Sequence, residues 1–83
     1  MLFLTIVHKI TFKYNNTTHE VLAKKFTGKR LKWYLITLHD GLNFVITPAG
    51  IVWLQENIPG ETIHPKEFIQ AVGSGLEAAG LVL

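Results

Sequence analysis

Residues 8 to 14 alternate between two kinds of side chain: His, Ile, Phe and Tyr at the even positions and Lys, Thr and Lys at the odd ones. A period of two is typical of a half-buried strand. The pair Asn15-Asn16 follows, and Asn tolerates the positive φ that a tight hairpin turn requires. We therefore predict a hairpin at this pair, with Ile10 opposite Val21 on the apolar face.

The returning segment of this hairpin, residues 17 to 26, also has helical features. Its first four residues, Thr17 to Glu20, fit a capping box, and Gly28 is suited to end a helix. The strand pairing explains both faces of the segment, whereas a helix would have only a thin apolar stripe. We predict a strand and keep the helix as the alternative.

A second hairpin is indicated by residues 31 to 38 and 43 to 46, which are rich in aliphatic, aromatic and β-branched side chains and flank Asp40-Gly41. An Asp-Gly step between such runs is a strong hairpin signal. The expected neighbours across this hairpin are Leu35 and Ile46, Thr37 and Phe44, and Ile36 and Val45. Both faces then carry apolar residues, as in central strands that are covered on two sides.

The segment from 48 to 57 has two interpretations. Residues 48 to 50 form a turn that leads into a fifth strand at 51 to 56, or Thr47 caps a short helix that begins at Pro48 and buries Trp53 and Leu54. The pattern leaves both open.

Several signals predict a helix near the C-terminus. His64 is placed as N-cap, Pro65 as the first helical residue, and Glu67 in the first turn, where its charge complements the helix dipole. Apolar residues then recur on one helical stripe, at Phe68, Ile69, Val72, Leu76 and Ala79. The fold class expected is α+β: a small antiparallel sheet of four to five strands, made of two consecutive hairpins, followed by this helix.

Length and composition bound the organisation of the chain. Its 83 residues suit a single domain over 1–83 with one core, and the absence of Cys excludes disulfides and cysteine metal sites. The apolar segment from 1 to 7 lacks the basic start and the length of a signal peptide and is too short to span a membrane. We expect it to be a buried strand, and we expect no membrane association and a cytoplasmic location.

Charged residues make up 17% of the chain, against about 25% in average soluble domains. Part of the surface should therefore be apolar, which favours a homo-oligomer. Two glycines flank Ser74 inside the predicted helix. Small residues there would allow the helix to pack closely, against the chain's own sheet in the favoured interpretation or against a second copy in the alternative. The candidate self-association residues are Ala71, Gly75, Ala78, Leu81 and Leu83.

Seven of the eight cations precede Thr47, whereas four of the six acidic residues follow it. Part of the basic half combines cations with aromatic rings, a combination that suits single-stranded nucleic acid because cations neutralise phosphates and rings stack on bases. The candidate residues are Lys24, Lys25, Lys29, Arg30, Lys32, Trp33 and Tyr34. The net charge is only +2 and no nucleic-acid motif is present, so a solvated turn is the favoured interpretation.

Catalytic and metal chemistry lack a motif. The four histidines, His8, His19, His39 and His64, have no spacing typical of zinc ligands, and Ser74 lacks the frame of a nucleophile elbow. We expect no catalytic residues, no metal and no cofactor. The leading hypothesis is a non-catalytic interaction module that self-associates and binds a protein partner; nucleic-acid binding is the second hypothesis, and a small enzyme or ligand carrier the third.

Overall fold

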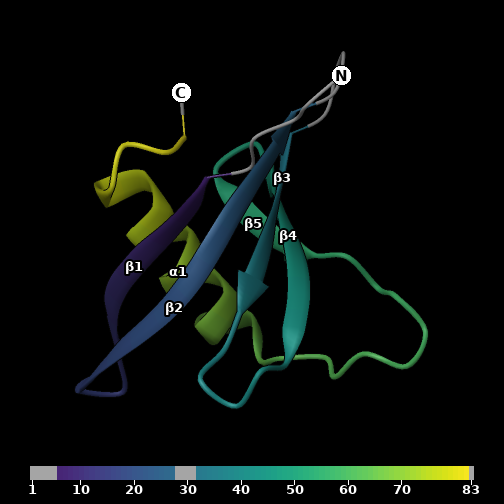
Figure 1. The fold of residues 1–83 in the computed structure, drawn as a ribbon, viewed down its shortest axis with the longest axis horizontal. Helices are drawn as coiled ribbons and strands as arrows, with labels where there is room; N and C mark the ends of the chain where they lie inside the picture. The colour runs from purple at the N-terminus through teal and green to yellow at the C-terminus, as the bar shows by residue number, and fades with distance from the viewer. Residues whose placement is uncertain (1–5, 28–31, 83) are drawn as a thin grey trace.

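The computed structural model describes residues 6–27 and 32–82, which form one antiparallel sheet of five strands and one α-helix (Figure 1). The elements are β1 (Val7–Tyr14), β2 (Thr17–Thr27), β3 (Lys32–Thr37), β4 (Asn43–Ala49), β5 (Val52–Gln55) and α1 (Lys66–Ala78). Each strand pairs with the next along the chain. In Figure 1, β1 and β2 pass in front of α1, which packs on one face of the sheet against β1, β4 and β5. The predicted α+β class is confirmed.

The first hairpin has the predicted register, with Ile10 opposite Val21. Asn15 and Asn16 both have positive φ, 51° and 61°, as the tight two-residue turn requires. Residues 17 to 26 belong to strand β2, so the strand prediction is confirmed and the helical alternative is wrong.

The register predicted for the second hairpin is wrong by one residue. Asp40-Gly41 does not act as a two-residue turn: the N–H of Gly41 donates to the carbonyl of Leu38 at 3.0 Å, and the N–H of Leu38 donates to the carbonyl of Leu42 at 2.8 Å. Gly41 has a φ of 87°, so the loop has three residues and ends on a left-handed glycine. The observed pairs are Tyr34 and Ile46, Leu35 and Val45, Ile36 and Phe44, and Thr37 and Asn43.

This shift changes which side chains lie inside, because a slip of one residue moves every side chain to the other face. Ile36, Phe44 and Ile46 share the face that α1 covers, and each is 0% exposed. Leu35 and Val45 lie on the opposite face and are half-buried. Both faces carry apolar residues, as predicted, and among the described residues α1 covers one of them.

The segment after Pro48 forms the fifth strand and not a helix. Gly50, with a φ of 69°, makes the turn, and Trp53 in β5 lies opposite Pro48. Thr47 does not cap a helix, because its hydroxyl donates to the carbonyl of Lys32 at 2.8 Å. The fifth strand is shorter than the predicted 51 to 56.

The C-terminal helix is confirmed, but it begins one residue later than predicted. Pro65 is its N-cap, in place of His64, with a ψ of 146°, and no side chain caps the first turn. Ile69, Val72 and Leu76 are buried on the sheet side, whereas Ala79 is the exposed C-cap.

The two glycines of α1 allow close packing between the helix and the sheet. A Cβ added to Gly73 would overlap the indole ring of Trp53, and one added to Gly75 would lie 2.9 Å from Cγ2 of Ile10 and 3.2 Å from Cβ of Phe12. The helix backbone therefore rests directly on β5 and β1.

The apolar N-terminal segment is described only at its end. Residues 1–5 lie outside the described residues, whereas Ile6 and Val7 are exposed and Val7 begins β1. Within the described ranges, 6–27 and 32–82, no helix is long and apolar enough to cross a membrane.

Candidate interaction surface

The sheet face opposite α1, which we call the open face, carries an apolar patch. Strand alternation and the observed register put eight large apolar side chains on this face, and one of them, Val7, belongs to β1. The other seven, the open-face patch, are Leu22 and Phe26 of β2, Trp33 and Leu35 of β3, Val45 of β4, and Val52 and Leu54 of β5. Leu54 is 52% exposed, Val52 45%, Leu22 41% and Trp33 40%.

The register also fixes how the patch is arranged across the strands. Phe26 lies opposite Trp33, and their rings stack with centroids 4.9 Å apart and planes 20° apart. Leu35 lies opposite Val45. Pairs of this kind stabilise the sheet locally, but they leave the solvent side of each ring and aliphatic chain uncovered.

Towards the β1–β2 hairpin the open face becomes polar. Lys9 and Glu20 lie on this part, with the Nζ and Oε1 atoms 3.8 Å apart, and both are well exposed. The hydroxyl of Thr37 donates to Oδ1 of Asn43 at 2.7 Å. Lys24 lies opposite Leu35 and between Leu22 and Phe26 on the same face of β2, so this cation lies within the open-face patch.

The residues predicted to bind nucleic acid are divided between the two faces. Lys24 and Trp33 lie on the open face, whereas Lys25 lies opposite Tyr34 on the face towards α1. Tyr34 is fully buried, and its hydroxyl donates to the carbonyl of Leu81 at 3.1 Å. Lys32 is exposed at the start of β3. Lys29 and Arg30 lie outside the described residues.

Burial has an electrostatic consequence for Tyr34. Loss of solvent disfavours the charged phenolate and raises the pKa of Tyr34 above its ordinary value of 10.0. A neutral, buried hydroxyl of this kind belongs to the core of the chain, and its ring is not available for stacking with a base.

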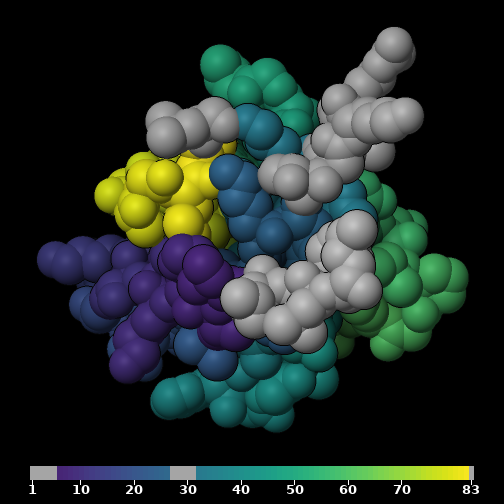
Figure 2. All heavy atoms as spheres, turned by 45° about the horizontal axis from the view of Figure 1, so that its top comes forward, coloured from purple at the N-terminus to yellow at the C-terminus, as the bar shows by residue number. Residues whose placement is uncertain are grey.

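The residues predicted for self-association also differ in placement. Gly75 is buried against the chain's own β1, and Ala71 and Leu81 pack beside the core, whereas Ala78 is exposed. Figure 2 shows the segment after α1, in yellow, beside β1, in purple. Leu83 lies outside the described residues. For Gly75 the structure shows the favoured interpretation, which was packing on the chain's own sheet.

The sequence patterns did not identify the open-face patch as a surface. The predicted register put Leu35 and Val45 on different faces, so their side chains could not be assigned to one exposed cluster. The signal that would have found the patch is the loop length around Gly41, because a three-residue loop restores the observed register. Within the described residues no group of three or more His, Asp and Glu side chains is arranged to hold a metal ion.

Comparisons with protein families, with curated proteins and with solved structures found no match to this chain.

Proposed function

We propose that this protein is a non-catalytic interaction module whose open face binds the open face of a second copy of the chain. The observation that supports this proposal most is the open-face patch, seven apolar side chains on the side of the sheet away from α1. Contiguous apolar surface of this kind marks an interaction site in soluble proteins.

A twofold arrangement suits the shape and charge of this face. Two sheets can pack face to face about 10 Å apart, with their inner side chains interdigitated. In a twofold dimer each open-face patch meets itself, so the apolar centres coincide and the polar parts near Lys9 and Glu20 stay at the rim. Lys24 lies within the patch, and its aliphatic stem can lie along apolar surface while the amine reaches towards water.

Sedimentation equilibrium of the full chain tests the proposal. Leu54 is 52% exposed, so burying the rest of its side chain contributes about 1 kcal/mol per copy and about 2 kcal/mol per dimer. Leu54→Ser should therefore weaken dimerisation about 30-fold. Ile63→Ser is the matched control, because Ile63 is 60% exposed in the loop before α1 and not on the open face. A wild-type chain that stays monomeric at about 1 mM, or equal effects of the two substitutions, would overturn the proposal.

Lys24→Ala distinguishes self-association from nucleic-acid binding. In a twofold dimer the two Lys24 side chains repel each other, so removing them should leave dimerisation unchanged or strengthen it. If the chain instead binds a single-stranded oligonucleotide, Lys24→Ala removes a phosphate contact. The affinity should then fall, and it should depend less steeply on salt concentration. Oligonucleotide binding that depends on Lys24, in a chain that does not dimerise, would replace the proposal with the nucleic-acid function.

A further inference from the structure

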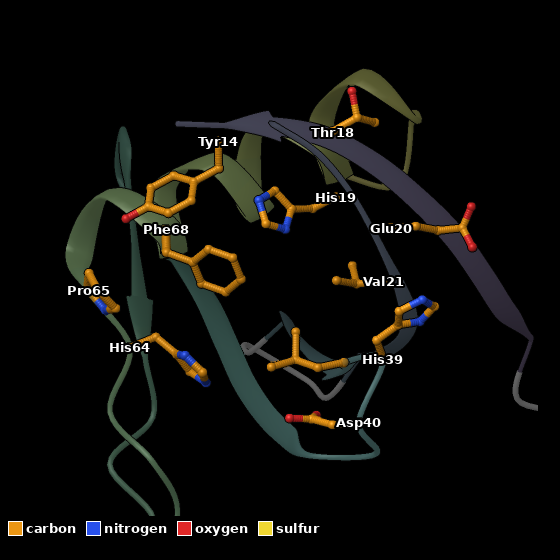
Figure 3. A pocket seen from close by; sticks show the side chains of 11 residues that line it. Tyr14, Thr18, His19, Glu20, Val21, His39, Asp40, His64, Pro65 and Phe68 are labelled. Atoms are coloured by element: carbon orange, nitrogen blue, oxygen red, sulfur yellow. The ribbon is translucent and has the colours of Figure 1, made fainter. Parts of the chain in front are cut away.

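A pocket of about 650 Å³ opens at the N-terminal end of α1, and none of the seven residues of the open-face patch lines it (Figure 3). It lies between the end of the β1–β2 hairpin, the β3–β4 turn and the residues just before α1. Val21, Leu38 and Phe68 supply apolar walls. The volume is in the range of about 300 to 1,000 Å³ that small-molecule sites have.

Three of the four histidines line this pocket, and they come from different parts of the chain. His19 belongs to β2, His39 to the β3–β4 turn and His64 to the segment before α1. Figure 3 shows the three imidazoles on different sides of the pocket. His8 does not line it.

Aromatic contacts hold two of these imidazoles in place. The ring of His19 stacks on that of Phe12, with centroids 5.5 Å apart and planes 14° apart. The rings of His19 and Phe68 form a T-shaped pair with centroids 6.1 Å apart. The ring of His64 lies 4.5 Å from that of Phe44. Both side chains are therefore positioned by ring packing before any ligand is present.

The ring nitrogens of these three histidines make no hydrogen bond to the part of the chain that the structure describes. A neutral imidazole has one donor and one acceptor, so the three rings together offer both kinds of group. The nearby carboxylates are already engaged: Asp40 accepts the N–H of Leu42 at 3.1 Å, and Glu20 pairs with Lys9.

We propose that this pocket binds a small planar aromatic molecule with hydrogen-bond donors and acceptors at its edge. The flat ring fits between the apolar walls and against Phe68, where ring stacking is favourable. The polar edge of the ligand meets the imidazole nitrogens, which have no hydrogen-bond partner among the described residues. Binding in this pocket requires neither a second copy of the chain nor the open-face patch. The binding proposal can therefore be tested independently of the proposed self-association.

Titration of the full chain with 4-hydroxybenzamide, followed by NMR of the histidine ring signals, tests this site. The signals of His19, His39 and His64 should shift and saturate with a dissociation constant of about 1 mM, whereas those of His8 should not move. trans-4-Hydroxycyclohexanecarboxamide keeps both polar groups but is not planar, and it should bind at least about threefold more weakly.

His39→Ala gives a second readout, because His39 is exposed in a turn and its loss should not affect folding. It should weaken binding of 4-hydroxybenzamide about threefold or more, and His8→Ala, the matched control, should leave binding unchanged. The proposal would be overturned if the histidine signals showed no saturable shifts. It would also be overturned if the two probes bound equally well, or if His39→Ala and His8→Ala had equal effects on binding.

Discussion

The contact between Gly73 and Trp53 leads to a sharp prediction about stability. In Gly73→Ala the new methyl group would overlap the indole ring, so either the ring or the helix must move. The ring is held on several sides: its Nε1–H donates to Glu77 at 2.9 Å, and the backbone N–H and carbonyl of Trp53 bond to the amide of Gln70 at 2.8 and 2.6 Å. Movement would therefore disturb these bonds as well as the packing.

Two opposing effects determine the size of the change. Replacing a mid-helix Gly by Ala favours the helix by about 1 kcal/mol. Forcing a methyl group into a packed contact costs up to about 3 kcal/mol, and the Gly73 site is at the upper end because the obstacle is a rigid ring. We expect Gly73→Ala to lower the free energy of unfolding by about 2 kcal/mol.

Urea unfolding at one fixed protein concentration measures this change, and the neighbouring positions serve as controls. Ser74 is exposed, so Ser74→Ala should stabilise the helix by about 0.5 kcal/mol. Gly75→Ala should fall between the two, because its methyl group would lie 2.9 Å from Cγ2 of Ile10 and 3.2 Å from Cβ of Phe12, a smaller overlap than at Gly73. In a Trp53→Leu background the penalty of Gly73→Ala should shrink or vanish. A Gly73→Ala protein as stable as the wild type would refute the reasoning.

Three further predictions concern single residues. Gln70→Ala leaves the backbone N–H and carbonyl of Trp53, at the edge of the sheet, without their partner. It should lower the free energy of unfolding in urea by about 1 to 3 kcal/mol, and a smaller decrease would mean that water replaces the amide. Gly41→Ala should cost about 1 kcal/mol because φ is 87°, and Gly41→Asn should cost less; equal losses would contradict this. The pKa of Tyr34 is raised in the folded state, so its contribution to stability is complete below the ordinary pKa of 10.0 and is lost as pH rises through the folded pKa. Tyr34→Phe should therefore flatten the fall in the free energy of unfolding at alkaline pH. An unchanged slope would contradict the raised pKa.

The first hairpin and the C-terminal helix could be predicted because local pattern and turn chemistry agree there. The alternation from 8 to 14 has one polar and one apolar face, so only one register hides the apolar set. The second hairpin lacks this constraint, since both faces of β3 and β4 are apolar. Asp40-Gly41 fits a loop of two or three residues, and nothing in the hydrophobic pattern chooses between them.

The candidate site depends on information that is not local. Which face of the sheet is exposed depends on the side where α1 docks, and on that side Gly73 and Gly75 allow the helix to pack closely on the sheet. The histidine-lined pocket likewise joins residues from β2, a turn and the segment before α1. Sequence spacing showed no cluster because the histidines are brought together only by the folded sheet.

Trp33 and Tyr34 show why a sheet of this size leaves one face open. They are adjacent in β3, yet Tyr34 is 0% exposed and Trp33 is 40% exposed, because successive side chains of a strand point to opposite faces. The 13 residues of α1 make a helix about 20 Å long and about 10 Å wide, whereas five strands span about 24 Å. One such helix can cover only part of one face. The chain has 48% hydrophobic residues, and apolar side chains lie on both faces of the central strands. Those of the open face have no cover among the described residues, and the proposed second copy would bring an equal patch of the same composition.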